Sequence, residues 1–84
     1  MERGQELIYF GDIVSARLVF QRAAEAGDAA AAVAMGSTYD PLMLAKYGIS
    51  GPTADVNKAR SWYEKAKALG STEAPDRLKL LAKQ

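Results

Sequence analysis

The chain has no cysteine and no histidine among its 84 residues. Without cysteine it has no disulfide, no thiol nucleophile and no thiolate ligand for zinc. Without histidine it lacks the side chain that most often acts as a general base near neutral pH and most often binds a metal. The carboxylates show no catalytic pairing, and the sequence has no phosphate-binding loop. We therefore expect no enzyme activity, no cofactor and no metal.

Long hydrophobic runs and a strong charge are also missing. No apolar run reaches the roughly 18 residues of a membrane span, and no signal peptide is visible. The net charge is only +1. Residues 1–42 carry three basic and six acidic side chains, and residues 43–84 carry eight and four. This asymmetry is too weak for the dense basic face of a nucleic-acid-binding protein, so we expect no nucleic-acid partner. Nothing in the composition indicates a compartment.

Two segments of the chain, 12–27 and 55–70, share one pattern at an interval of 43 residues. Five pairs of residues are identical: Asp12 and Asp55, Ala16 and Ala59, Arg17 and Arg60, Ala23 and Ala66, and Gly27 and Gly70. Conservative pairs include Phe20 with Tyr63. A fixed period of this size is typical of helical repeat proteins.

Each repeated segment reads as an amphipathic helix with defined ends. An aspartate stands where it can cap the first turn, and a glycine stands where a left-handed residue ends a helix. Between them runs an apolar stripe at helical spacing. The stripe consists of Ile13, Ala16, Phe20 and Ala23 in the first segment, and of Val56, Ala59, Tyr63 and Ala66 in the second.

Further helices are predicted beside these two. The sequence predicts them over 2–10, over 29–39 with Asp28 as the cap, and near the C-terminus with Thr72 as the cap and Pro75 in the first turn. The connections at Gly11, at residues 27–28 and at residues 70–71 are short, which makes neighbouring helices antiparallel. We therefore predict one domain over 1–84 with an all-α fold. Its helical hairpins would stack as a short right-handed α-solenoid of about five helices.

The segment 40–54 interrupts this regular pattern. Asp40 followed by Pro41 resembles an N-cap with proline at the first helical position, which predicts a short helix over 41–47 ended by Gly48. Four larger apolar residues are predicted to fold back on the other helices: Leu42, Leu44, Tyr47 and Ile49.

The second repeated segment also resembles a known family. Its order Asp-x-x-x-Ala-Arg-x-Trp-Tyr-x-Lys-Ala, from Asp55 to Ala66, is similar to the second helix of a Sel-one-like repeat, a relative of the tetratricopeptide repeats. The alanine-rich segment that ends in Gly36-Ser-Thr-Tyr39 resembles the first helix of that repeat. The insertion after Tyr39 is a departure from the pattern. The resemblance implies protein–protein interaction or complex assembly, often in bacterial envelope or signalling systems. It also implies a C-terminal domain of a longer bacterial protein.

Three aromatic residues are candidates for contact with a protein partner, namely Tyr9, Tyr47 and Trp62, because interfaces favour tyrosine and tryptophan. The alternative for Trp62 is a structural role beside Tyr63. Tyr39 is predicted to pack between neighbouring hairpins. Arg17 and Arg60 recur at equivalent positions, so we expect their stems to lie along apolar surface.

Two functions fit these patterns. The first is a non-catalytic module that binds a protein or peptide of unknown identity. The second is a purely structural capping, spacing or self-association domain of a larger protein.

Overall fold

The computed structural model describes residues 13–48 and 54–83, and these residues form five helices. The helices are α2 (Ile13–Glu25), α3 (Ala29–Tyr39), α4 (Pro41–Lys46), α5 (Val56–Ala68) and α6 (Ala74–Ala82). No strand occurs in the described part of the chain, so the prediction of an all-α fold is confirmed there. The predicted helix 2–10 and the capping role of Asp12 lie outside the described residues.

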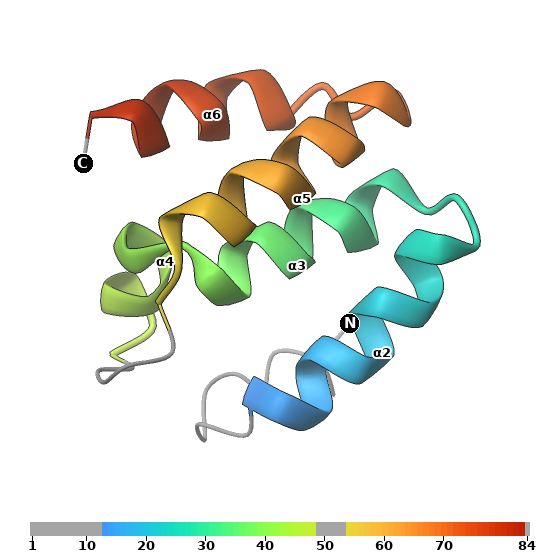
Figure 1. Cartoon of the computed structure of the whole chain (residues 1–84), viewed down its shortest axis with the longest axis horizontal. Coiled ribbons are helices and arrows are strands. Elements are labelled where there is room, and N and C mark those ends of the chain that lie inside the picture. Colours follow the sequence, from blue (N-terminus) through green and yellow to red (C-terminus); the bar gives the residue numbers. More distant parts are fainter. Residues whose placement is uncertain (1–12, 49–53, 84) are drawn as a thin grey trace.

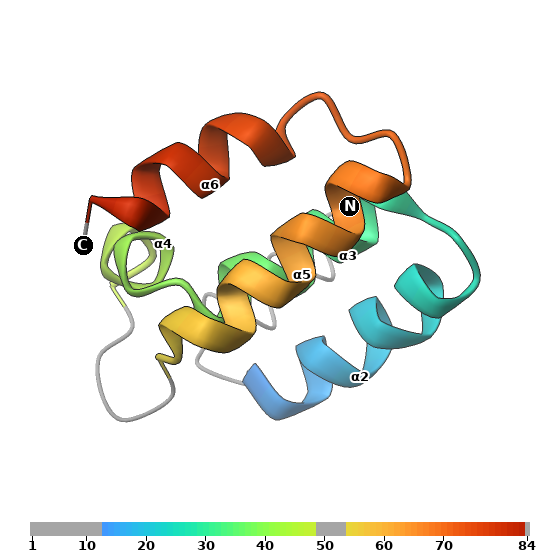
Figure 2. The ribbon, with the colours of Figure 1, turned by 45° about the horizontal axis from the view of Figure 1, so that its top comes forward.

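Helices α3 and α5 lie side by side in the middle of the molecule, with α2 against α3 and α6 against α5 (Figures 1 and 2). Successive long helices run in opposite directions, as their short connections predict (Figure 1). The short helix α4 follows α3 and lies near the C-terminal end of α6 (Figure 2). This arrangement is consistent with stacked hairpins, and the right-handed solenoid stays a prediction.

The two repeated helices end in the same way. Gly27 has φ +100° and Gly70 has φ +99°, so both occupy the left-handed region that favours glycine. The N–H of Asp28 donates to the Ala23 carbonyl over 3.0 Å, and the N–H of Ser71 donates to the Ala66 carbonyl over 2.9 Å. These bonds are 43 residues apart and belong to the same type of helix C-cap. The repeat in the sequence is therefore also a repeat in the backbone.

Aspartates cap three of the helices, as predicted. Carboxylate oxygens accept from the Ala31 N–H at Asp28, from the Leu42 N–H at Asp40 and from the Lys58 N–H at Asp55. The Oδ1···N distances are 3.1, 2.9 and 3.0 Å. Each bond satisfies an N–H group that has no partner within its own helix.

The predicted cap of the last helix is wrong. The Ser71 hydroxyl, and not that of Thr72, accepts from the N–H groups of Glu73 and Ala74, over 3.2 and 3.1 Å. Helix α6 begins at Ala74, which places Pro75 in the first turn. The first intrahelical bond comes from Arg77, so the missing N–H of proline removes no bond from the helix.

The core surrounds α3, which is buried along most of its length. Alanines from α2, α3, α5 and α6 form most of the central cluster, and Tyr63 is its largest side chain. The Tyr63 ring lies against Gly36 of α3, where a Cβ atom would stand 2.5 Å from the ring Cδ1 atom. The absence of a side chain at Gly36 therefore allows α3 and α5 to approach each other.

Tyr63 also joins α5 to the start of α4. Its hydroxyl donates to Oδ2 of Asp40 over 2.7 Å, while Oδ1 of the same carboxylate caps α4. Both side chains are fully buried. Burial raises the pKa of the Tyr63 hydroxyl above its ordinary value of 10.0, so the group stays protonated and donates at neutral pH. One carboxylate thus fixes the junction of three helices.

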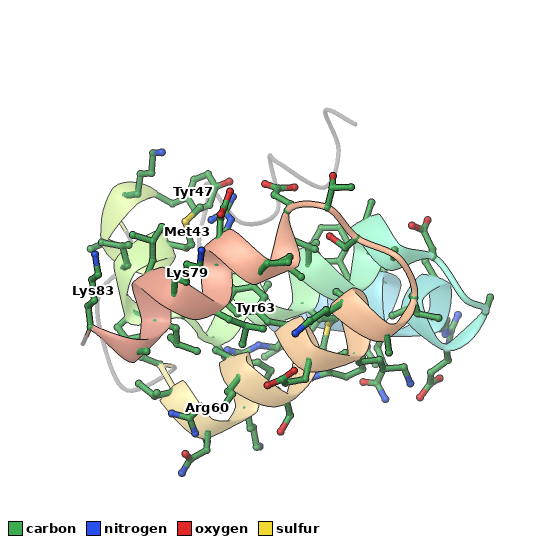
Figure 3. All side chains as sticks on the ribbon, turned by 90° about the horizontal axis from the view of Figure 1, so that it is seen from above. Met43, Tyr47, Arg60, Tyr63, Lys79 and Lys83 are labelled. Atoms are coloured by element: carbon green, nitrogen blue, oxygen red, sulfur yellow. The ribbon has the colours of Figure 1, made fainter. Side chains whose placement is uncertain are left out.

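Arg17 and Arg60 occupy equivalent repeat positions but make different contacts. The Arg17 guanidinium donates to the Thr38 carbonyl over 2.6 Å and to the Thr38 hydroxyl over 3.1 Å, and it lies 3.7 Å from the centre of the Tyr39 ring. The Lys58 amine lies 5.4 Å from the centre of the same ring. Tyr39 therefore packs between α2 and α5, as predicted. Arg60 is exposed on α5 (Figure 3).

We expect the substitution Arg17→Ala to lower the free energy of unfolding by about 1–2 kcal/mol, because it removes bonds from a cation to a partly buried carbonyl. Arg60→Ala is the matched control and should change that free energy by less than about 0.5 kcal/mol, since Arg60 is exposed. Urea unfolding of both variants measures the difference. Equal losses would contradict the distinct roles of the two arginines.

The apolar residues of segment 40–54 only partly fold back on the other helices. Leu44 is buried with Ile13 and Ala16, as predicted. The prediction is wrong for Leu42 and Tyr47, which are 43% and 38% exposed. Met43 is buried beside Leu44 instead, because a helix of six residues directs only one side inward. Ile49 lies outside the described residues.

The sulfur of Met43 contacts the Arg77 guanidinium, which brings α4 and α6 together. Arg77 also forms an ion pair with Glu73 of the same helix turn, with an N···O distance of 3.0 Å. Across residues 13–48 and 54–83, no helix has the length and apolar character needed to cross a membrane.

Candidate protein-binding surface

Helix α2 has apolar side chains on two opposite sides. Its inner side carries Ile13, Ala16 and Ala24, which are buried. The opposite side consists of five residues that share one face at helical spacing, and we call it the α2 outer face: Val14, Ser15, Leu18, Val19 and Arg22. A helix that packs only against its own domain needs a single apolar stripe. The second side is therefore not explained by the packing of α2 on α3.

The apolar residues of the α2 outer face are open to solvent. Val14 is 71% exposed, Leu18 is 56% exposed and Val19 is 46% exposed. Single exposed apolar residues are common on protein surfaces, whereas contiguous ones mark sites of interaction. These three lie within two turns of one helix, so they form a contiguous group.

The same face borders a surface hollow with a volume of about 420 Å³. Among the described residues, those that line it are Ser15, Leu18, Val19 and Arg22, all from α2. Their spacing of i, i+3, i+4 and i+7 is that of a single helical face. Two of these four residues, Leu18 and Val19, are aliphatic, and Arg22 carries a guanidinium.

The charge at this surface comes from Arg22. Its neighbour one turn later, Glu25, accepts a hydrogen bond from the Gln21 side chain over 3.1 Å. The Glu25 carboxylate is therefore held toward Gln21, and the exposed Arg22 guanidinium gives the α2 outer face a positive edge.

The two repeats differ at two exposed positions of this face. Val14 and Leu18 correspond, 43 residues later, to Asn57 and Ser61 of α5, which are exposed as well. The second repeat thus has polar residues at these two positions, as a solvated surface does, whereas Val19 corresponds to the half-buried Trp62.

The sequence-predicted candidates lie elsewhere. Tyr47 is exposed at the C-terminal end of α4 (Figure 3). Trp62 is half-buried and packs against the central cluster. The Lys65 amine lies 5.5 Å from the centre of a Trp62 ring. Tyr9 lies outside the described residues. The binding role of Tyr47 and Trp62 stays a prediction.

Sequence reasoning missed the α2 outer face, although a signal for it was present. The matching positions that define the repeat include buried ones such as Ala16 and Ala59. The informative positions are those that do not match, where valine and leucine replace asparagine and serine at exposed sites.

The described residues form no cluster of three or more side chains able to hold a metal ion. No family model, curated protein or solved structure was found to match the chain.

Proposed function

We propose that this chain is a non-catalytic helical-repeat module of the Sel-one-like type that binds a protein or peptide through the α2 outer face. The observation that carries the proposal is the contrast between the repeats: Val14 and Leu18 are exposed where α5 has Asn57 and Ser61. A partner that covers the exposed part of Leu18 gains about 1 kcal/mol or more of transfer free energy.

The repeat assignment is supported by the shared helix ends at Gly27 and Gly70 and by the cap at Asp55. Of these features, the left-handed Gly27 fixes the C-terminal end of α2.

The test replaces the two exposed residues with their counterparts from the second repeat, Val14→Asn and Leu18→Ser, in one variant. We expect this variant to bind a protein partner captured by the full chain at least about tenfold more weakly, because the apolar contact is lost. Isothermal titration calorimetry with the purified partner measures the affinity. The melting temperature should stay within a few degrees of the original, since surface changes have small effects.

Leu80→Ser is the matched control, because Leu80 is a similarly exposed leucine on α6. It should retain full affinity. Equal binding by all three proteins would place the interaction on another surface and contradict the proposal. Sedimentation of the free chain tests self-association: a dimer that the double variant converts to a monomer would identify the partner as a second copy.

A further inference from the structure

We infer that α6 is a capping helix on which no further repeat hairpin can stack, because its outer side carries charge where α3 receives α5. We call four exposed residues the α6 outer face: Asp76, Lys79, Leu80 and Lys83. Helix α6 lies on the side of the molecule away from α2 (Figures 1 and 2). The inference therefore goes beyond the proposed function and does not depend on a partner of α2.

The caps of α3 and α6 show which of their residues correspond. Oδ1 of Asp28 accepts from the Ala31 N–H over 3.1 Å. Oγ of Ser71 accepts from the Ala74 N–H over 3.1 Å, 43 residues later, at the interval that relates α5 to α2. The C-cap residues of α3 and α6 lie at the same interval. Each residue of α6 therefore has a counterpart in α3.

The counterparts of the α6 outer face form the surface of α3 on which α5 packs. All four are buried: Val33, Gly36, Ser37 and Asp40. The Tyr63 ring of α5 lies against Gly36, and the Tyr63 hydroxyl donates to Oδ2 of Asp40. Docking of α5 thus requires a position without a side chain and, one turn later, a hydrogen-bond acceptor.

The α6 outer face has neither of these features. Lys79 stands at the position of Gly36, so its side chain occupies the space that an aromatic ring fills on α3. Lys83 stands at the position of Asp40, and an ammonium group can only donate hydrogen bonds. Asp76 replaces a buried valine, and a stacked helix would remove its carboxylate from water. A helix that packed here as α5 packs on α3 would therefore meet a steric block and bury charged groups.

Outside this face, α3 and α6 agree in their burial. Ala31 and Thr38 are buried in α3, and their counterparts Ala74 and Leu81 are buried in α6. The difference between the two helices is thus confined to one side. The last helix of a stack needs a polar outer side, because that side meets water and not another repeat.

The test extends the full chain by one repeat, with an unaltered second copy of residues 41–83 attached directly after residue 83. One extended chain keeps the native α6 outer face. The other carries the α3 residues at the three charged positions, as Asp76→Val, Lys79→Gly and Lys83→Asp. Both also carry Leu80→Cys as a probe, because the chain has no cysteine of its own and the α3 counterpart is a serine of similar size.

The rate of thiol labelling measures whether the appended repeat covers the α6 outer face. With the native face we expect the same rate as in the unextended Leu80→Cys chain. With the α3 residues we expect a rate at least about tenfold lower, because labelling then requires local opening. The urea m-value should rise by roughly half in the second chain alone, since it scales with the surface exposed on unfolding.

Protection of the thiol beneath the native face would overturn the inference, since α6 would then accept a further repeat. Full labelling rates in both extended chains would overturn it as well, because the charged residues would then not decide whether a repeat stacks.

A second variant tests the steric block without the extension. Gly36→Lys places the α6 residue on α3, in contact with the Tyr63 ring. We expect it to lower the melting temperature by at least about 10 °C, whereas Lys79→Gly on the exposed face should lower it by only about 5 °C. Equal shifts would mean that a lysine at this position does not prevent docking, and the inference would be wrong.

Discussion

Replacement of Asp40 with alanine should lower the free energy of unfolding by about 3 kcal/mol. The carboxylate has two structural roles at once: Oδ1 caps α4 and Oδ2 accepts from the buried Tyr63 hydroxyl. Loss of an N-cap alone costs about 1 kcal/mol. Loss of the acceptor adds the cost of a buried hydroxyl deprived of its strong bond. Equilibrium unfolding in urea measures the sum.

Asp28→Ala is the matched control, because Asp28 caps α3 through a side chain that lies at the surface. It should lose only about 1 kcal/mol. A double-mutant cycle with Tyr63→Phe isolates the buried bond, and we expect a coupling energy of about 1 kcal/mol or more. If Asp40→Ala cost no more than Asp28→Ala, the bond to Tyr63 would contribute nothing to stability.

The second large effect is expected at Gly36. Alanine is the better helix former by about 1 kcal/mol, so Gly36→Ala would stabilise an exposed helix. Here the new Cβ would stand 2.5 Å from Cδ1 of the Tyr63 ring, which is fully buried and held by its hydrogen bond to Asp40. We expect a net loss of about 2 kcal/mol and a melting temperature lower by roughly 10 °C.

A second background makes this result specific. In Tyr63→Leu the ring is absent, so the added methyl group meets a smaller and more adaptable side chain. Gly36→Ala should then be neutral or stabilising relative to Tyr63→Leu alone, because only the helix propensity remains. Calorimetric melting of the four proteins provides the comparison. The same loss in both backgrounds would place its cause away from the ring.

Local features of this fold were predictable from the sequence because they depend on near neighbours. The caps at Asp28 and Asp55 and the left-handed glycines at Gly27 and Gly70 require only a few consecutive residues. The burial of Tyr63 followed from its place on a repeated stripe.

Features that depend on distant segments were not predictable in this way. Arg17 and Arg60 have the same local sequence position, and only the presence of Thr38 and Tyr39 beside Arg17 distinguishes them. The sequence predicts Thr72 as the cap of the last helix, whereas the Ser71 hydroxyl accepts from the N–H groups of Glu73 and Ala74 and α6 begins at Ala74. The side of α4 that faces inward carries Met43, and this orientation depends on the contact of Met43 with Arg77 of α6.

The candidate surface was the least predictable part. Aromatic residues were favoured as interface residues by their chemistry, and one of them, Trp62, is instead half-buried against the core. The α2 outer face consists of ordinary aliphatic residues, whose meaning appears only when exposure is known. Exposure distinguishes Leu18, at 56%, from leucines such as Leu81, at 2%.

The hydrogen bond between the Tyr39 carbonyl and the Asp55 N–H, 2.8 Å long, has a consequence for protein engineering. It holds the last residue of α3 next to the N-cap of α5. Because donor and acceptor are main-chain groups, the side chain of Tyr39 can be exchanged without removing this bond, whereas Asp55→Pro would abolish it, since proline has no N–H to donate.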